Sequence, residues 1–274
     1  MMGCKTIHVI TVHWPTADWA DVQLRQLRFH VSSPRRFLAV LPDDRSIGFD
    51  IELRSPKIAR TALYSSHSHW HNLNALTDVA IDGAHDDDVL LAIDGDAFPI
   101  DDLRPIIERT LFERAHGVLS IQTVGRQRTF TDRPTAIFCA IRVGLWRRLG
   151  VGWQMASFRG TIQGEKGRLR GVKDTCGQLV KALIKRKISW RCLRRTNTFE
   201  LVWPRFGVYG DLIYHHGQAF RGAQTYDRLK KWIAIAWPSN VTPAEAEILR
   251  YSNWIGDAVR RTILFDPKFV RKFM

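Results

Sequence analysis

Hydrophobic and polar positions follow two different periods along the first half of the chain. Short runs of apolar, often β-branched residues cover 6–14, 36–41 and 89–93. Between them, apolar residues recur every three or four positions after Asp18 and from Asn72 to Ile81. The first pattern is typical of buried strands, and the second of helices that bury one face. This order predicts βαβ units, and therefore a parallel sheet with right-handed crossovers.

The same patterns predict where the elements begin and end. Asp18, Asp101 or Asp102, and Asp174 each stand before a helical pattern and are predicted N-caps. Gly83 is the expected stop of the helix over 72–81. Leu103, Ile107 and Leu111 are four residues apart and predict one buried helix face. Further strands are expected near 49–53, 118–124, 135–143, 188–193 and 208–214.

The domain organisation follows from this alternation. It predicts an α/β fold, a single Rossmann-like α/β/α sandwich with a mostly parallel central sheet, over residues 1–226. Within this domain, residues 1–124 alternate regularly, whereas residues 125–226 include a Gly-, Arg- and Lys-rich stretch at 156–173, interpreted as a loop near an anionic ligand or acceptor. Residues 227–274 mix Trp and Phe with Arg and Lys, and we expect a helical, aromatic, basic extension there.

The net charge is the unusual part of the composition. With 45% hydrophobic and 25% charged residues, the 274-residue chain is otherwise typical of globular proteins. A net charge of +14 argues for an anionic partner, which could be nucleotide phosphates, nucleic acid or an acidic membrane surface. The cations and aromatics of residues 268–273 suit an anionic lipid surface and a phosphate backbone equally well.

Cysteine spacing and hydropathy exclude several classes of protein. Four widely spaced cysteines without a C-x-x-C pair favour neither a zinc site nor a disulfide framework, which predicts a reducing cytoplasm. No signal peptide is recognised, and no apolar run approaches the roughly 20 residues that span a bilayer. The expectation is a cytoplasmic protein that is soluble or peripheral to the membrane.

The strongest chemical signal is the sequence Asp94-Gly95-Asp96, directly after the apolar run at 89–93. Open α/β sheets bind ligands at the carboxyl ends of their strands. Two carboxylates one residue apart repel each other, and a divalent cation such as Mg²⁺ or Mn²⁺ relieves that repulsion. The simpler interpretation is an acidic turn that leads into the next helix.

The order of the motifs resembles the glycosyltransferase A (GT-A) fold. A nucleotide-binding α/β half, a D-x-D, an acid at a helix start and a late histidine follow one another between about residues 6 and 222. The segments that carry the resemblance are I-H-V-I-T-V-H, L-P-D-D, H-N-L-N-A-L, L-L-A-I-D-G-D-A-F-P, K-D-T-C-G and I-Y-H-H-G. The resemblance implies a GT-A catalytic domain with a nucleotide-sugar-binding half (1–124) and an acceptor-side half (125–226).

The resemblance also implies a metal site. Asp94 and Asp96 would bind Mn²⁺ or Mg²⁺ on the phosphates of a nucleotide-sugar donor, with Asp94 also facing the ribose. His215 corresponds to the family's late metal ligand. His216 is adjacent, and side-chain alternation along a strand would turn it to the opposite face, which favours His215 as the ligand.

A catalytic base is implied at Asp174. In inverting members of the family, an acid at this place accepts the proton of the acceptor hydroxyl. A helix N-terminus would keep the carboxylate charged. The structural alternative is a simple N-cap, and both roles are compatible. If the reaction retains configuration, no such base is required.

Donor contacts are implied at the edge of the predicted sheet. Asp43 and Asp44 follow the second strand, where the family often contacts the base or ribose, and His13 ends the first strand. An ordinary polar loop explains these residues equally well. Asn74 is expected at the start of its helix, where its amide could touch the nucleotide.

A second histidine cluster, His67-Ser68-His69-Trp70-His71, precedes that helix. On extended backbone the three imidazoles would share one face, as a Zn²⁺ site needs. With a helix predicted from Asn72, however, His71 turns away from the other two. The preferred interpretation is a loop that borders the donor cleft.

These expectations describe a metal-dependent glycosyltransferase that moves a sugar to an acceptor hydroxyl. The preferred acceptor is an envelope glycan or a lipid-linked saccharide, with peripheral contact to an anionic membrane. A hydroxylated base in DNA is the alternative acceptor, since it also fits the charge of +14. The rival functions are a nucleotidyltransferase, which also uses paired carboxylates and Mg²⁺, and a non-catalytic nucleic-acid-binding protein.

Overall fold

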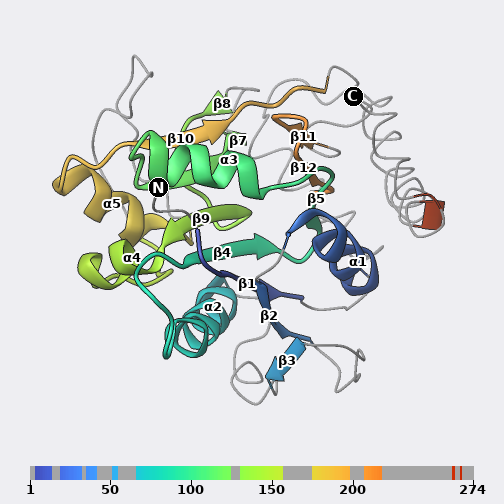
Figure 1. Ribbon diagram of the computed structural model, residues 1–274, viewed down its shortest axis with the longest axis horizontal. Helices are drawn as coiled ribbons and strands as arrows, with labels where there is room; N and C mark the ends of the chain where they lie inside the picture. The colour runs from blue at the N-terminus through green and yellow to red at the C-terminus, as the bar shows by residue number, and fades with distance from the viewer. Residues whose placement is uncertain are drawn as a thin grey trace, which may run out of the picture.

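A seven-stranded sheet forms the centre of the molecule (Figure 1). The computed structural model describes residues 4–13, 19–32, 35–41, 51–54, 66–124, 130–156, 175–197, 207–217, 261–262 and 266. The strand order is β10-β6-β9-β4-β1-β2-β3. The strands are β1 (Ile7–Val12), β2 (Arg35–Val40), β3 (Ile51–Arg54), β4 (Val89–Asp94), β6 (Val118–Ile121), β9 (Phe138–Arg142) and β10 (Trp190–Leu193).

The sheet is mostly parallel, which confirms the predicted fold class. β1 pairs in parallel with β2 and β4, β2 with β3, and β10 with β6. Only β9, among the described strands of this sheet, runs antiparallel to its neighbours β4 and β6. A parallel return needs a crossover of about a dozen residues, usually a helix. Between β6 and β9 the chain instead forms a two-stranded ribbon, β7 (Thr123–Val124) with β8 (Phe130–Thr131).

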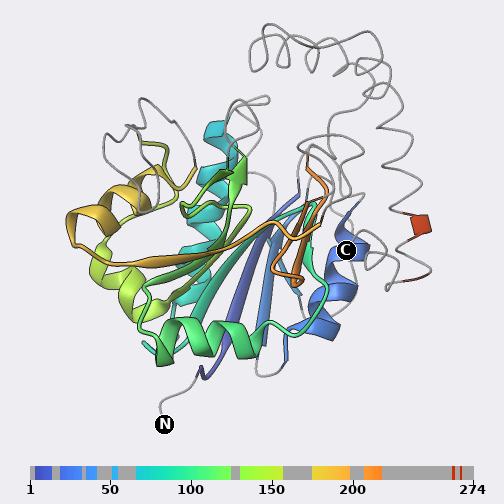
Figure 2. The same ribbon diagram turned by 90° about the horizontal axis from the view of Figure 1, so that it is seen from above.

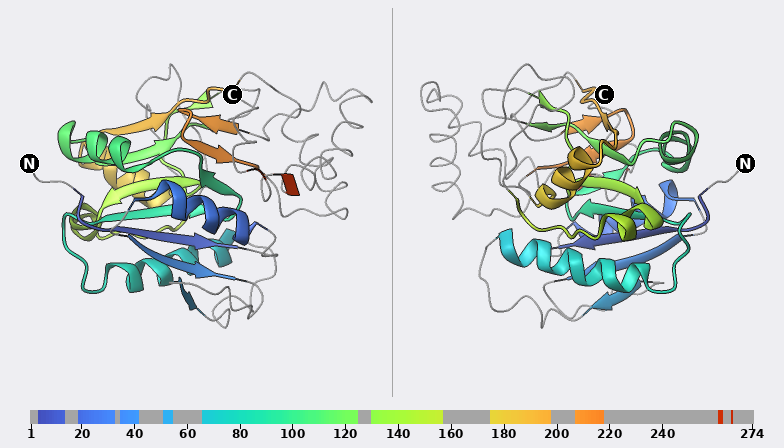
Figure 3. Two further views of the ribbon diagram at one scale, coloured as in Figure 1. Left: turned by 45° about the vertical axis from the view of Figure 1, so that its right-hand side comes forward. Right: turned by 90° about the vertical axis from the view of Figure 1, so that its left-hand side faces the viewer.

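Helices cover both faces of the sheet and complete an α/β/α arrangement (Figure 3). One face packs against α2 (Ser66–Ile81), α4 (Val143–Leu149) and α5 (Gly177–Lys185). The other packs against α1 (Ala20–His30), α3 (Arg104–Glu108) and the short π-helix η2 (Arg109–Glu113). Alternation along β1 divides its side chains between the two cores: Ile7 and Val9 face α1, and Ile10 and Val12 face α2. Burial on both faces explains why the strand sequences are continuously apolar.

The strand order reverses between β1 and β4. β2 and β3 extend the sheet on one side of β1, whereas β4 pairs with its other side. In open α/β sheets, the carboxyl ends of the strands at such a switch point form the ligand crevice. The D-x-D turn lies at this point, because β4 ends at Asp94.

A small second sheet covers that point (Figure 2). Its order is β11-β12-β5, formed by β11 (Gly207–Tyr209), β12 (Ile213–His215) and β5 (Ala97–Pro99). β5 begins only three residues after β4 ends, so this sheet packs close to the end of the central one. The single strand expected at 208–214 is therefore a hairpin of two short strands.

The predicted helix starts needed the most correction. The helix expected from Asn72 begins at Ser66 and runs 16 residues. The N-cap residue is Trp19 for α1 and Cys176 for α5, and neither side chain forms a capping hydrogen bond. Asp18 and Asp174 are therefore not the N-cap residues. At α3 the N-cap is Leu103, while Asp102 Oδ1 accepts a hydrogen bond from the Arg104 N–H at 3.1 Å.

Other predictions fall partly or wholly outside the described residues. The loop predicted over 156–173 lies outside them except for residue 156, as does the extension over 227–274 except for residues 261, 262 and 266. The division into domains stays a prediction. Within the described part of the chain, no helix has both the length and the apolar character needed to cross a membrane.

Candidate metal centre

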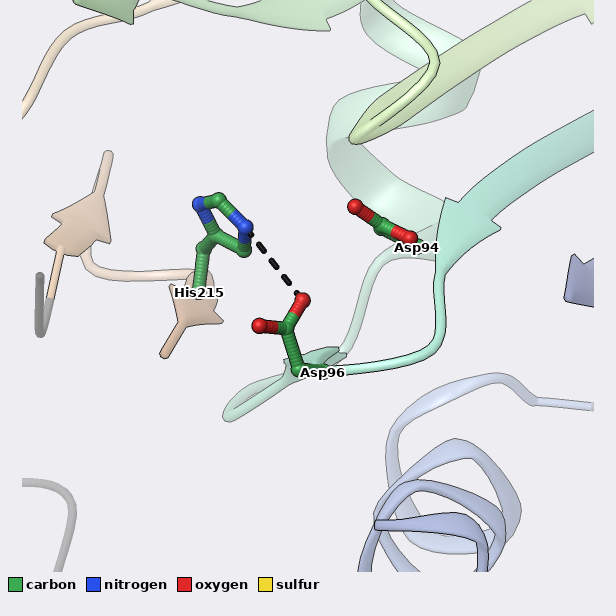
Figure 4. Close-up of side chains that lie close together, drawn as sticks. All are labelled: Asp94, Asp96 and His215. Carbon is green, nitrogen blue, oxygen red and sulfur yellow. Dashed lines mark ion pairs between the residues drawn. The ribbon is translucent and has the colours of Figure 1, made fainter. Parts of the chain in front are cut away.

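Three side chains converge at the end of β4: Asp94, Asp96 and His215 (Figure 4). Each offers one ligand atom, and these atoms all lie within 4.8 Å of one another. His215 Nε2 forms an ion pair with Asp96 Oδ1 at 3.3 Å. Among the described residues, this is the one cluster of acidic, histidine or cysteine side chains arranged in this way.

The pairing of β12 with β5 brings His215 to the two aspartates across more than a hundred residues of sequence. His215 lies opposite Ala97 in this antiparallel pair. The His216 N–H donates to the Asp96 carbonyl oxygen at 3.0 Å and extends the contact to the turn itself. The backbone of the hairpin therefore fixes His215 above the D-x-D turn.

Burial and the neighbouring charges shift the pKa values of the cluster in opposite directions. Burial raises the pKa of the Asp94 carboxyl, and the neighbouring Asp96 charge raises it further, although His69 and His215 act in the opposite direction. Burial alone lowers the pKa of His215, but the Asp96 and Asp94 carboxylates outweigh it and raise the pKa overall. Two carboxylates held together in a buried place need more positive charge than one imidazolium supplies.

The donor set fits a hard or borderline divalent cation. Carboxylate oxygens suit Mg²⁺ and Mn²⁺, and one imidazole nitrogen is compatible with Mn²⁺. At metal–ligand distances of about 2.1 Å, ligand atoms around one ion are roughly 3 to 4 Å apart. The three atoms, within 4.8 Å of one another, are close to that separation.

His216 points away from this cluster into an aromatic core, as strand alternation predicted. Its Nδ1 shares a hydrogen bond of 2.9 Å with the Tyr214 hydroxyl. Its ring lies 4.5 Å from that of Trp19, and the Phe98 ring lies 5.0 Å from that of Tyr214. These buried rings hold the hairpin against β5 and α1, so the contacts of His216 are those of a residue that supports the fold.

His13 does not lie where a donor contact was expected. Its side chain is fully buried, and its Nε2 hydrogen-bonds to Gln23 Oε1 at 2.9 Å. A Cβ atom on Gly95 would lie 2.9 Å from His13 Nδ1, so the ring is directly beneath the D-x-D turn. Without an exposed atom, His13 supports the turn and cannot reach a donor directly.

Asn74 also has a different place from the one expected. Because α2 begins at Ser66, Asn74 lies in the middle of the helix. Its Oδ1 accepts a hydrogen bond from the Trp153 N–H at 2.9 Å. The side chain therefore ties the segment after α4 to α2. Its expected position at the start of the helix is corrected, and the nucleotide contact stays a prediction.

The histidines before Asn72 belong to α2 and not to a loop. Residues 69 and 71 are 200° apart around a helix, so their side chains cannot share a face as on extended backbone. The His71 ring stacks on Trp70 at 3.6 Å, whereas His69 is close enough to Asp94 to lower the pKa of that carboxyl. His69 thus lies on the α2 side of the cluster.

Three predicted site residues, Asp43, Asp44 and Asp174, lie outside the described residues. The start of α5, just after Asp174 in sequence, is linked to α2. The Gln178 N–H donates to the Gln154 carbonyl oxygen at 3.2 Å, and the neighbouring Trp153 is held by Asn74.

Sequence reasoning missed two residues near the cluster. Gln23 is fully buried in α1, four positions before Leu27 on the same helix face. A polar residue within an apolar stripe was the available signal. Arg195 lowers the pKa of His215 through its charge, and nothing in the local pattern around it indicates that proximity.

No family model matches the chain, and no curated protein matches its sequence. Among solved structures, it is similar to the mannosyltransferase PcManGT from Pyrobaculum calidifontis, in complex with GDP-Man and Mn²⁺, with 14% identity over 95% of this chain and 75% of that one, at a TM-score of 0.43. It is also similar to the galactosyltransferase LgtC, in complex with donor and acceptor sugar analogs, with 16% identity over 52% of this chain and a TM-score of 0.34. The matched part spans 59% of the LgtC structure. The function therefore has to be inferred from this chain's own residues.

Proposed function

We propose that this chain is a metal-dependent glycosyltransferase, which transfers a sugar from a nucleotide-sugar donor to an acceptor hydroxyl. The observation that carries the proposal is the cluster of Asp94, Asp96 and His215 at the switch point of a parallel sheet. This is where α/β folds bind nucleotides, and the donor set is one for Mn²⁺ or Mg²⁺. The D-x-D after a buried strand and the late histidine also follow the order of the GT-A motifs.

The roles of the residues follow from the chemistry. A nucleoside diphosphate leaves with growing negative charge, and a divalent cation held by Asp94, Asp96 and His215 would stabilise that charge. Asp94 has the second role of facing the donor ribose. His69, on the α2 side of the cluster, is a further candidate for contact with the donor.

Asp174 remains the proposed base for an inverting reaction. Its task requires an ionised carboxylate within hydrogen-bond reach of the attacking hydroxyl. The support is indirect: α5 begins three residues after Asp174, and its first turn is tied through Gln154 and Trp153 to the helix that carries His69. Asp43 and Asp44 stay proposed contacts to the donor base or ribose.

For the acceptor we propose a saccharide, either an envelope glycan or a lipid-linked sugar. Lys181, Lys185, Arg186 and Lys187 are exposed on and after α5. With the net charge of +14, they support contact with an anionic surface beside the acceptor site. A peripheral position at a membrane in the cytoplasm fits this proposal.

The test is incubation of the purified protein with a panel of nucleotide sugars and Mn²⁺, with released nucleoside diphosphate as the measurement. We expect release with at least one donor, and loss of release in Asp96→Ala. Release of pyrophosphate instead would indicate a nucleotidyltransferase. No release with any donor, or full activity in Asp96→Ala, would overturn the proposal.

A further inference from the structure

Gln23 is a buried polar side chain that contacts both ends of the D-x-D turn. It comes from α1, on the face of the sheet opposite to α2, and is fully buried. Its Nε2 donates to the Asp94 carbonyl oxygen at 2.6 Å and to the Ala97 carbonyl oxygen at 2.7 Å. One amide group therefore bridges the two ends of the four-residue turn that carries both proposed metal ligands.

The orientation of this amide is fixed from its other side. Gln23 Oε1 accepts a hydrogen bond from the Thr11 hydroxyl at 2.9 Å and lies 2.9 Å from His13 Nε2. Carbonyl oxygens only accept, so the two N–H groups of Gln23 must face the turn and Oε1 must face β1. It follows that His13 carries its proton on Nε2. Burial, the main cause, lowers the pKa of His13 to about 4, so the ring is neutral near neutral pH.

His13 supports the turn from below. A Cβ atom at position 95 would lie 2.8 Å from the Val12 carbonyl oxygen and 2.9 Å from His13 Nδ1. Side chains other than hydrogen do not fit at such distances, which explains the glycine between the two aspartates. The turn is thus held by Gln23 at both ends and rests on His13 in the middle.

We propose that Gln23 is a positioning residue, which presets the Asp94–Ala97 turn so that its two carboxylates face His215 before a cation binds. This inference rests on the proposed function, because it assumes that the turn binds a divalent cation. Two like charges in a buried place would otherwise separate by changing the backbone of the turn. Gln23 prevents that change by holding the carbonyl groups at both ends of the turn.

Gln26 offers a matched control within the same helix. It is also a glutamine of α1 and also buried, at 1% exposure compared with 0% for Gln23. Within the described part of the chain, neither polar atom of its side chain has a hydrogen-bond partner. Gln23→Met and Gln26→Met therefore make the same chemical change in the same helix, and only the first removes contacts with the turn.

The primary measurement is Mn²⁺ affinity without any donor, followed by the electron paramagnetic resonance signal of free Mn²⁺. Loss of such supporting hydrogen bonds typically weakens metal binding by about 10- to 100-fold, and we expect this range for Gln23→Met. Gln26→Met should bind Mn²⁺ like the unmodified protein. Urea unfolding shows whether each variant is folded under the conditions of the titration.

A second variant and a second readout keep the test decisive if Gln23→Met fails to fold. Thr11→Val has nearly the same shape, removes one hydrogen bond that orients Gln23, and should weaken Mn²⁺ binding by a few fold, about the value of one hydrogen bond. Nitrogen NMR of the unmodified protein should show the Nε2–H tautomer of His13.

Each outcome has one meaning. Weaker Mn²⁺ binding in folded Gln23→Met or Thr11→Val, but not in Gln26→Met, supports the inference. Equal binding in the folded Gln23 and Gln26 variants, or the Nδ1–H tautomer of His13, overturns it and leaves the proposed function intact. No Mn²⁺ binding by the unmodified protein overturns the metal site of the proposed function and this inference with it.

Discussion

The two ends of the central sheet each hold a histidine paired with a buried aspartate, and the pairs differ in what surrounds the carboxylate. At the amino ends of β1 and β4, His8 Nε2 lies 3.1 Å from Asp88 Oδ2. At the carboxyl ends, His215 Nε2 lies 3.3 Å from Asp96 Oδ1. Residue types, distances and burial are similar, so pairing alone does not distinguish a structural site from a ligand site.

The difference is in the hydrogen bonds. Asp88 accepts two backbone N–H groups, from Thr6 at 2.9 Å and His85 at 2.8 Å, in addition to its contact with His8. Burial acts to raise the pKa of Asp88, but these hydrogen bonds outweigh it and lower the pKa below 3.8. The protein itself stabilises this charge, and no cation is needed.

At the carboxyl end, two carboxylates lie close together, and each makes the ionised form of the other less favourable. Asp94 Oδ1 accepts a hydrogen bond from the adjacent Gly95 N–H at 3.0 Å, and its pKa is raised. A buried acid that backbone donors satisfy serves the fold, whereas buried acids that repel each other retain affinity for a cation. This contrast predicts opposite consequences for mutations at the two ends.

The largest expected effect is on activity. Asp96→Asn should lower sugar transfer at least about 100-fold, because stabilisation of the leaving group is lost. The free energy of unfolding should change little or increase. Activity is measured as nucleoside diphosphate release and stability by urea unfolding. Asp101→Asn, which changes an exposed carboxylate outside the cluster, is the control. A stability loss that accounts for the activity loss would contradict the contrast.

The next effect is on stability at the amino end. Asp88→Asn replaces one carboxylate oxygen by an NH2 group, so the N–H of either Thr6 or His85 loses its acceptor, and the change should cost about 2 kcal/mol in urea unfolding. Mn²⁺ affinity of the folded variant should be unchanged. Since the pKa of Asp88 is lower in the folded protein, its contribution is present above pH 3.8 and is lost as pH falls below that value. Asp86→Asn, in an exposed pair with Arg147, should cost under about 1 kcal/mol. Equal losses of stability in Asp88→Asn and Asp86→Asn would show that the hydrogen bonds of Asp88 contribute no more than an exposed ion pair.

The sequence predicted the parts of the fold that depend on local pattern. The apolar runs predicted β1, β2 and β4, and the position of Asp94 at the end of β4 follows directly from one of them. The antiparallel direction of β9 depends on the ribbon before it, which contains only short strands without a strong pattern. The early start of α2 was missed because its first turn is rich in histidine and serine, without apolar spacing.

The parts of the site formed by neighbouring residues in the sequence were predictable, whereas contacts between distant segments were less so. Resemblance to a known order of motifs indicated His215, while its contact with Asp96 depends on strand pairing that no local pattern encodes. Gln23 and His13 illustrate the limit. Their position beneath the turn is set by the packing of α1 on the sheet, and a sequence does not show which buried polar groups meet.

A smaller effect concerns the pH dependence of metal binding. The pKa of His215 is raised above its ordinary 6.5, so a larger share of the rings carries a proton at a given pH, and a cation must displace that proton. Mn²⁺ affinity should rise with pH from 6 to 8, by up to about tenfold per unit where His215 is protonated. His215→Gln should bind Mn²⁺ more weakly and with a flatter pH profile. Equal slopes for both proteins would show that His215 does not exchange its proton for the cation.

The smallest effect is on the metal-free protein. Because the pKa of Asp94 is raised in the folded state, the folded protein holds this proton more firmly than the unfolded chain. Its charge therefore costs stability once pH exceeds 3.8, and the cost grows until pH passes the folded pKa. Asp94→Asn removes this cost and keeps the oxygen that accepts from the Gly95 N–H.

In urea unfolding with a chelator, Asp94→Asn should thus be slightly more stable than the unmodified protein at pH 7 and equal to it near pH 4. Added Mn²⁺ should reverse the order at pH 7, since it stabilises only a folded state that binds it. The same substitution at Asp88 destabilises the protein with or without Mn²⁺. If Asp94→Asn were destabilising in the chelator, the carboxyl end would be a structural site like the amino end, and the contrast between the two acids would fail.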